Sequence, residues 1–335
     1  MHIQGHLPPA VARVYQTTPV GADAHHDVPL SNLAVAAFAA ADDNLVAEGL
    51  FPAVPVGKQS NQYYVISRNE FWRLPQTGLQ RAPRTEPRRV QFTVSSEAYY
   101  AHNYALAAEN ALEDMENQDI AIQLRQNSTK LVTGLLRLDQ EVRIADLVTS
   151  ISNVGSGVQL TGADKWGDAS SDPIGAVNTG HAFMRSQTGL VANTAVIDWD
   201  TMQVVRRHPA MIDLFKHTTA GELTMAQIAD VFKVDRILVG MALRENAVEG
   251  GTSSVTNVWG NNVVLAHVGP STGLQSMTLG LRLQWRNPIF PADFGVATNR
   301  EDRAGQRKVE VLEAGHYQDE KIVAADLAYV IADTI

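Results

Sequence analysis

The spacing of apolar residues predicts a helix over residues 31–48. Its apolar residues fall on one face at three- and four-residue intervals: Leu33, Ala37, Phe38 and Ala41. Ser31 or Asn32 can cap the start of this helix, and Gly49 ends it. Residues 51–56 contain two prolines, and they are expected to be extended because a residue before proline avoids the helical region.

A long hairpin is predicted within residues 60–97. One strand covers residues 62–67, the returning strand covers residues 89–95, and prolines punctuate the polar tip from 75 to 87. An isolated two-stranded ribbon is marginally stable in water. We therefore expect this hairpin to lie against a partner surface.

Residues 98–150 are helical by composition and contain no proline. From about residue 120 to residue 149, apolar residues repeat every seven positions, with two more interleaved four later: Leu124, Leu131, Leu138 and Ala145, then Leu135 and Val142. This spacing predicts one helix, roughly 45 Å long at about 1.5 Å per residue, with a narrow apolar seam. Gly134 is tolerated inside it at modest cost.

The second half of the chain is predicted to be an α/β region followed by paired strands. After a loop over residues 152–173, the predicted helices are 174–188, 199–208 and 224–231, and the predicted strands are 194–197, 237–242 and 262–268. In residues 278–285 and 307–312, apolar and polar residues then alternate as they do in paired strands, and residues 322–331 form a final apolar segment. This order of parts predicts an α+β chain with protruding elements, which is unusual for a monomeric enzyme.

The composition excludes several classes of protein. With 335 residues, 45% of them hydrophobic and 19% charged, the chain is globular. It has no cysteine, which excludes disulfides, thiolate metal sites and a cysteine nucleophile. No apolar run approaches the roughly 20 residues that span a bilayer, and residues 1–10 do not resemble a secretory signal. A net charge of −9 is unlike a protein that grips DNA by neutralising phosphates, so any contact with nucleic acid is expected to be that of a container wall.

Short phrases spread over residues 31–335 carry a resemblance to a known family. In chain order they are residues 51–56 with Lys58, Tyr63 and Tyr64; 166–168 with 171–174; 188–189, 193–194 and 208–209; 223–234 with 239–240 and 246–247; and 258–260 with Leu265. Phrases of this kind occur in the same order in the major capsid proteins of tailed bacteriophages, which have the Hong Kong 97-type fold. The shared order is specific to that family, and by it the chain resembles these proteins. The first thirty residues match no such phrase. Their weak periodicity predicts an arm held by packing on something else, such as a neighbouring subunit.

The resemblance implies an α+β fold with five parts. These are an N-terminal arm over residues 1–50, an extended E-loop over 51–97, a peripheral domain with the spine helix over 98–172, an axial domain over 173–271, and C-terminal strands over 272–335 that return to the peripheral domain. Residues 248–257 are a candidate for the axial loop at the centre of a capsomer.

The same resemblance implies a structural role without a catalytic residue, a cofactor or a metal. Copies form pentamers and hexamers and close into an icosahedral procapsid that expands around double-stranded DNA. The implied partners are other copies, a portal, in some members a decoration protein, and non-specifically held DNA, with no membrane. About fifty residues precede the hairpin, too few for an internal scaffolding segment, so a separate scaffolding protein is implied. The implied location is the virion capsid, with assembly in the host cytoplasm.

Charged residues supply the candidate contact surface between subunits. No lysine lies between Lys58 and Lys130, so the hairpin tip cannot provide the amine by which certain family members cross-link. The hairpin instead carries six arginines, and an acidic cluster follows it: Arg68, Arg73, Arg81, Arg84, Arg88 and Arg89, then Glu109, Glu113, Asp114, Glu116 and Asp119. We hypothesise that the arginines of one subunit lie over the acidic cluster of its neighbour, since arginine binds carboxylates in a planar, bidentate geometry. The alternative is that both are solvated surfaces.

Other chemistry-bearing patterns favour ordinary structural roles. The sequence His25-His26-Asp27 lacks further ligands at metal spacing. Asp198 and Asp200 resemble a carboxylate pair, but Asp200 is well placed to cap the next helix. Residues 155–157 (GSG) lack the spacing of a nucleophile elbow, and no glycine-rich nucleotide-binding motif is present. Trp166 and Trp259 are expected to be core or interface anchors.

Two other functions are compatible with parts of this pattern. An encapsulin-like nanocompartment shell has the same fold but encloses protein cargo, and the long hairpin rich in proline and arginine favours the phage subunit over it. A soluble α/β enzyme is disfavoured by the missing motifs and the protruding parts.

Overall fold

The computed structural model describes residues 25–26, 45–66, 74, 79–81, 83–87, 89, 94–116, 123–215, 222–247, 251–269, 277–286, 295–303 and 307–335. By their internal contacts, the residues form two compact units. The first unit combines Met1–Phe38, Ala105–Gly134 and Asn287–His316, and the second combines Ala39–Tyr104, Leu135–Arg286 and Tyr317–Ile335. Most of the helix predicted over residues 31–48 lies outside the described residues, and its end carries the short helix α2 (Ala47–Leu50).

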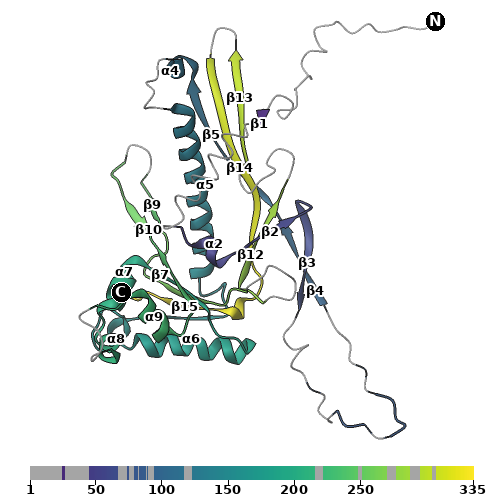
Figure 1. The fold of residues 1–335 in the computed structure, drawn as a ribbon, viewed down its shortest axis with the longest axis vertical. Coiled ribbons are helices and arrows are strands. Elements are labelled where there is room, and N and C mark those ends of the chain that lie inside the picture. Colours follow the sequence, from purple (N-terminus) through teal and green to yellow (C-terminus); the bar gives the residue numbers. More distant parts are fainter. Residues whose placement is uncertain are drawn as a thin grey trace, which may run out of the picture. The chain divides into compact units, whose positions relative to one another are not determined.

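The second unit contains a five-stranded sheet (Figure 1). Its strands follow the order β6 (Ser156–Gln159), β15 (Ala328–Ala332), β11 (Val263–Ala266), β7 (Thr194–Asp198) and β8 (Arg236–Gly240). Strand β11 pairs antiparallel with β15 and β7, whereas β6 and β8 at the edges pair in parallel with their neighbours. The predicted strands over 194–197, 237–242 and 262–268 are therefore confirmed. Strand β6 and the short helix η1 (Gly162–Asp164) fall where a loop was expected.

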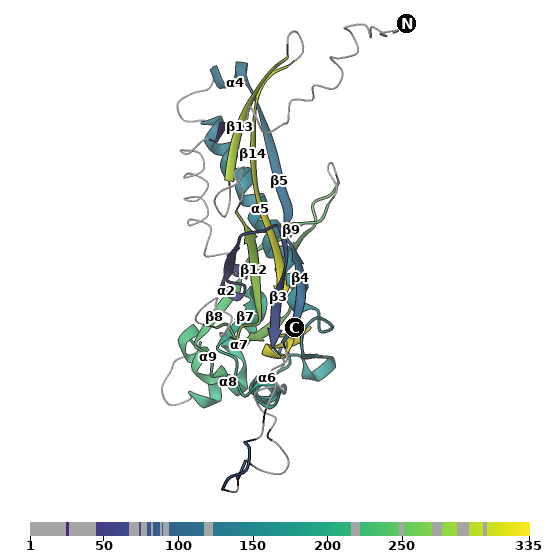
Figure 2. The ribbon, with the colours of Figure 1, turned by 90° about the vertical axis from the view of Figure 1, so that its right-hand side faces the viewer.

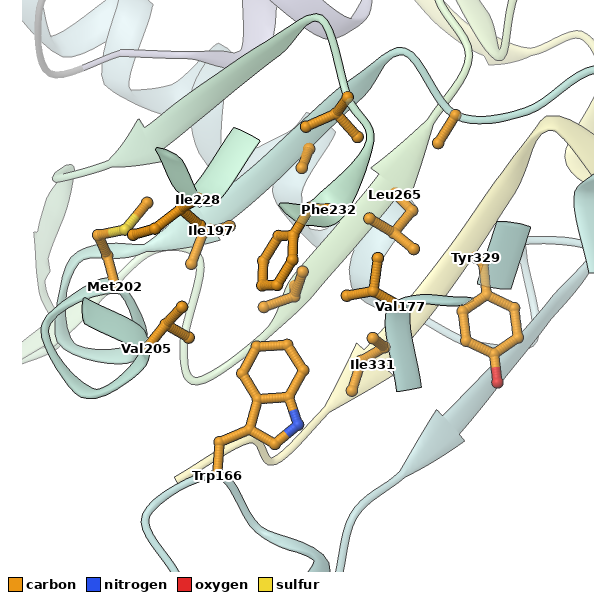
Figure 3. Packing of buried hydrophobic residues seen from close by; sticks show 14 of the residues in the cluster. Trp166, Val177, Ile197, Met202, Val205, Ile228, Phe232, Leu265, Tyr329 and Ile331 are labelled. Atoms are coloured by element: carbon orange, nitrogen blue, oxygen red, sulfur yellow. The ribbon is translucent and has the colours of Figure 1, made fainter. Parts of the chain in front are cut away.

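Helices bury both faces of this sheet. Alternate residues such as Ile197, Leu265 and Ile331 join a core with four helices: α6 (Pro173–Thr188), α7 (Trp199–Arg207), α8 (Pro209–Leu214) and α9 (Met225–Phe232) (Figure 3). The intervening Val196 and Val264 join a second core with α2 and α5 (Leu124–Thr149). Because side chains alternate along a strand, a strand buried on both faces reads as a continuous apolar run. The helices predicted over 174–188, 199–208 and 224–231 are confirmed.

A second group of strands packs beside this body within the same unit. Strand β12 (Gly280–Trp285) pairs in parallel with β2 (Ala53–Val56) and antiparallel with the end of β14 (Arg307–Ile322). A Cβ atom added at Gly280 would lie 2.2 Å from the ring of Phe51, so only glycine fits without a shift. The final apolar segment forms η2 (Ala325–Leu327) and then β15.

Two hairpins belong to the second unit. Strands β3 (Ser60–Ile66) and β4 (Val94–Tyr100) pair antiparallel and lie side by side in Figure 2, which confirms that a hairpin is present. Its returning strand was predicted over residues 89–95, and only residues 94 and 95 of that range belong to β4, because β3 pairs with residues further along the chain. Strands β9 (Leu243–Glu245) and β10 (Val255–Asn257) form the shorter one, within which part of the candidate axial loop lies.

In the first unit, β13 (Gly295–Arg303) pairs antiparallel with β14, and β1 (His25–His26) pairs with β13. The helix expected to begin near residue 98 is wrong for residues 98–111, because residues 98–100 end strand β4 and residues 102–111 form strand β5 (His102–Ala111). The short helix α4 (Leu112–Glu116) follows. The segment is rich in alanine and favours a helix by composition, but pairing with β14 overrides that preference.

The predicted long helix is confirmed as α5, although most of its apolar seam does not face a core. Leu131 is 61% exposed and Leu135 is 46% exposed, whereas only Ala145 of the seam is buried. The buried positions of α5 are instead a mixed set: Thr129, Val132, Thr133, Leu136, Arg137, Gln140, Glu141, Ile144, Ala145 and Val148. The helix therefore buries polar side chains on one side and exposes leucines on the other.

Candidate functional site

The β3–β4 hairpin is attached to the second unit at its base. The backbone N–H of Tyr100 donates to the carboxylate of Asp319 at 2.9 Å. Further along, side chains join the two strands to each other, as where the Tyr63 hydroxyl donates to Glu97 at 2.7 Å. Burial, and then this carboxylate, raise the pKa of Tyr63. Among the described strands, β3 and β4 pair only with each other, so the ribbon gains no support from a larger sheet.

Three of the six hairpin arginines lie in the described residues, and all three are exposed: Arg81, Arg84 and Arg89. The guanidinium of Arg89 lies 3.7 Å from the Glu86 carboxylate, with both side chains more than 85% exposed (88% and 86%). Such a pair contributes at most about 1 kcal/mol. The remaining three, Arg68, Arg73 and Arg88, lie outside the described residues. The described arginines are thus available to another surface at little cost.

Four members of the acidic cluster are described and exposed. Glu109 lies near the end of β5, and Glu113, Asp114 and Glu116 lie on α4. Asp119 lies outside the described residues. The acidic residues belong to the first unit and the hairpin arginines to the second. The cluster thus has the exposure that an intermolecular contact requires.

Arg143 of α5 organises the region where β4 leads into β5. Its guanidinium donates to Glu320 at 2.8 Å, pairs with Asp139 and lies 3.7 Å from the centre of the Tyr104 ring. Glu320 is 8% exposed and Arg143 is 20% exposed, so this pair is shielded from water and salt. The contacts fix the base of the hairpin relative to α5 within the second unit.

A buried carboxylate joins α5 to α2. Glu141 is 2% exposed and accepts hydrogen bonds from the N–H groups of Val46 at 3.0 Å and Ala47 at 2.9 Å. It also accepts from the indole N–H of Trp259 at 2.7 Å. Burial raises the pKa of Glu141, and these three hydrogen bonds oppose that rise. The arrangement satisfies the first donors of α2 and is structural.

The expected capping role of Asp200 is wrong, because Asp198 caps α7 by accepting from the N–H of Asp200 at 3.1 Å. Asp198 is 1% exposed, and burial raises its pKa to about 6. The Asp200 carboxylate instead accepts from the side-chain amide of Asn257 at 2.8 Å. In the same hairpin, the Glu245 carboxylate accepts from the N–H groups of Ala247 at 2.9 Å and of Ser254 at 2.6 Å, which fixes the described ends of the connection between β9 and β10.

The described part of the chain offers little for catalysis. His208 and Ser171 lie 3.1 Å apart, but the Nδ1 atom of His208 accepts from the N–H of Ala210. In the neutral ring the proton is therefore on Nε2, the atom that faces Ser171. That atom cannot accept the proton of the serine hydroxyl, as a catalytic base would have to do. A cavity of about 320 Å³ beside them is lined mainly by Trp166, Gln203, Val204, Arg207 and Pro209. Trp166 and Trp259 are core residues, each 1% exposed.

Among the residues that the structure describes, no group of three or more histidine, aspartate or glutamate side chains is placed to hold a metal ion. The side chains of His25 and His26 fall outside the described part. None of the described helices is long and apolar enough to cross a membrane.

Comparison with known proteins finds two phage shell subunits that are similar to this chain. It is 25% identical to the major capsid protein of Pseudomonas phage JBD67, over 90% of this chain and 96% of that protein. It is 27% identical to the major capsid protein of Burkholderia phage BcepMu, over 91% and 95% of the two chains. No family model matches the sequence.

Solved structures agree on the fold. A phage-related protein from Bordetella bronchiseptica covers 93% of this chain and 98% of its own at 21% identity, with a TM-score of 0.71. A capsid structure of cyanophage P-SCSP1u covers 84% and 85% at 10% identity, with a TM-score of 0.55. The Hong Kong 97-type α+β fold predicted from the sequence is confirmed.

Proposed function

We propose that this chain is a major capsid protein of a tailed bacteriophage, a coat subunit that assembles with its own copies into an icosahedral head around double-stranded DNA. The observation that carries this proposal is similarity over at least nine-tenths of the chain to two phage major capsid proteins, of 25% and 27% identity. The fold supports it, because a two-stranded ribbon outside a larger sheet is marginally stable in water and exposed leucines are typical of a surface that binds a partner. The role is structural and requires no catalytic residue.

The hairpin supplies the proposed contact between neighbouring subunits. We assign its arginines to the acidic cluster of β5 and α4 on the next copy. Exposure supports this pairing, since Arg81 and Arg84 are exposed and form no ion pair with another described residue, and arginine can bind two carboxylate oxygens at once. Complementary charge then fixes the register of one copy against the next. The five-part division into arm, E-loop, peripheral domain, axial domain and terminal strands is part of the same proposal.

Further partners follow from the proposed role. They are pentamers and hexamers of the chain itself, a separate scaffolding protein, a portal and in some cases a decoration protein, with DNA held non-specifically inside. The subunit assembles in the host cytoplasm and ends in the virion capsid. With a net charge of −9, it is suited to enclosing DNA and poorly suited to gripping it.

Electron microscopy of the protein expressed alone and with its neighbouring genes tests the proposal. Closed shells or capsomer-sized rings are expected, and particles from infected cells should contain DNA. Particles filled with an enzyme would instead indicate a nanocompartment, and a monomer under every condition would contradict the proposed role. Replacing Arg81, Arg84 and Arg89 by glutamate should abolish shells while the subunit stays folded. Unchanged shell yield in that variant would contradict the arginine contact alone.

A further inference from the structure

Helix α7 begins with an exposed tryptophan. The Trp199 side chain is 47% exposed, whereas Thr201, Met202 and Val205 of the same helix are buried, the last two in the core shown in Figure 3. Tryptophan is enriched at the energetic centres of protein contacts. Its indole N–H group is normally hydrogen-bonded once the ring is buried. A partner for Trp199 must therefore offer both an apolar site and a hydrogen-bond acceptor.

The other end of α7 borders the cavity of about 320 Å³ described above. Its apolar walls include Trp166, Val204 and Pro209, and its polar groups include Gln203 and Arg207. Sites for cofactors and other small molecules usually have about 300–1,000 Å³, so this cavity is suited to a guest no larger than one bulky side chain. Gln203 is half-buried and forms no hydrogen bond with another described residue, so its amide oxygen can accept one from such a guest.

The tryptophan end of α7 carries a negative charge. Asp200 is exposed, and its carboxylate accepts from the side-chain amide of Asn257 at 2.8 Å. That amide is neutral, and among the residues that the structure describes Asp200 has no cationic partner. The carboxylate beside Trp199 is therefore available to a cation on another molecule.

The cavity end of the same helix carries an excess of positive charge. Arg206 and Arg207 lie 3.7 and 2.7 Å from the single carboxylate of Glu222, so within this group one positive charge is uncompensated. Arg207 is 67% exposed and donates to Glu222 through its Nε atom. Its two terminal amino groups form no hydrogen bond with another described residue, and they are free to bind a second carboxylate.

The two ends of α7 are thus complementary in shape and in charge. Trp199 does not line the cavity of its own subunit, and it lies eight residues before Arg207, or roughly 12 Å along the helix at about 1.5 Å per residue. A subunit that carries a guest side chain at one end and a matching cavity at the other binds its own copies head to tail. Contacts of this heterologous kind close into rings.

We propose that Trp199 of one copy inserts into the cavity beside Arg207 of a second copy. The choice of a second copy rests on the proposed function, in which copies form pentamers and hexamers. The indole ring packs on Trp166 in the cavity, its N–H group donates to Gln203, and the Asp200 carboxylate pairs with Arg207. The contact is apolar at its centre and polar at its rim, as protein interfaces usually are. It is separate from the contact proposed for the hairpin arginines.

Disulfide cross-linking tests which residues meet, because the chain has no cysteine of its own. Asp200→Cys and Arg207→Cys are introduced into separate full-length chains, which are mixed during assembly and then mildly oxidised. The mixture should give a covalent dimer on a non-reducing gel, well above the yield from either variant alone. In the matched control, Val191→Cys replaces Asp200→Cys. Val191 is 46% exposed but precedes β7, whereas α7 follows that strand, so the control should give no excess of dimer.

Sedimentation velocity of the full-length subunit measures the strength of the contact. Trp199→Ala should weaken association between copies by about tenfold or more, whereas Val191→Ala should associate as the wild type does. Asp200→Asn and Arg207→Gln should each weaken association by a smaller factor. Together they should cost no more than the larger single change, because both remove the same pair. Charges at the ends of a helix also stabilise the helix itself, so thermal unfolding establishes that each variant is folded.

Dimer yields equal to those of the Val191→Cys control would overturn the proposal, as would unchanged association of a folded Trp199→Ala variant. Loss of shells in that variant only when the neighbouring genes are co-expressed, with self-association unchanged, would assign the cavity to another protein and overturn it as well. Electron microscopy follows shell formation separately. Shells that form without the cross-link would refute this contact and leave the coat role intact. A specific cross-link between copies that never build rings or shells would support the contact and oppose the coat role.

Discussion

Replacing Gly280 by alanine tests the packing between β12 and the segment that leads out of α2. The added Cβ would lie 2.2, 2.4 and 2.8 Å from three ring atoms of Phe51, where an ordinary contact is 3.4 Å or more. Phe51 is completely buried, so its ring must move by about 1 Å within a filled core. Overpacking of this kind costs about 1–3 kcal/mol. We expect Gly280→Ala to lower the free energy of unfolding of the second unit by about 1–3 kcal/mol.

The measurement is urea denaturation of the unassembled subunit, followed by tryptophan fluorescence, with Gly134→Ala as the matched control. Alanine at position 134 meets no atom within 4 Å and should raise stability by up to about 1 kcal/mol. Phe51→Leu should partly rescue Gly280→Ala, so that the two substitutions together cost less than their sum. Stability within about 0.5 kcal/mol of wild type for Gly280→Ala, or strictly additive effects with Phe51→Leu, would refute the steric argument.

Three further substitutions have distinct expected outcomes. Burial raises the pKa of Asp198 from 3.8 to about 6, so the stability that protonated Asp198 contributes is complete below pH 3.8 and is lost as the pH rises through 6. In unfolding curves measured between pH 4 and 7, Asp198→Asn should remove up to about 3 kcal/mol of this loss of stability. Arg125→Met leaves the carboxylate of Glu310, 7% exposed, without its bidentate partner and should cost about 3 kcal/mol, and calorimetry that shows no change would contradict the pairing. Trp259→Phe removes the indole donor to Glu141 and should cost about 2–3 kcal/mol in thermal unfolding, an expectation that a wild-type melting temperature would overturn.

The parts of the fold that local sequence determines could be predicted. Helix α6 begins at Pro173 after the capping residue Asp172 and ends before Gly189, whose φ of 74° favours glycine. Its limits follow from a few neighbouring residues, and so the prediction over 174–188 was accurate. The first strand of the hairpin, β3, was also predicted closely, whereas the returning strand β4 begins five residues later than predicted because its limits depend on pairing with β3.

Long-range contacts determine the parts that the sequence did not reveal. Strand β5 has a helical composition, but its partner β14 lies about two hundred residues further along the chain. The orientation of α5 was also beyond local pattern, because Glu141 is buried only where Trp259 and the start of α2 supply donors. Asp200 was favoured as a cap by position alone, and the backbone angles at Asp198 decide the matter.

The proposed contact surface is harder still to derive from one chain. The arginines and carboxylates were identified from the sequence because charge clusters are visible there. Their described members are exposed, as a contact with a neighbour requires, but the partner of an intermolecular salt bridge is another molecule. The leucine seam was likewise visible as a pattern, but the exposure of Leu131 and Leu135 was not, because the spacing alone predicts a buried stripe.

The order of strands in the five-stranded sheet determines when during translation the sheet can be completed. Strand β15 lies between β6 and β11, yet of the five strands it is the last to leave the ribosome. Until then, the edges of β6 and β11 lack their shared neighbour, and the valines on both faces of the sheet have no complete layer to pack against. The complete sheet can therefore form only after residue 332 has been translated. For the coat subunit proposed above, a finished body is thus available for assembly only once strand β15 has been synthesised.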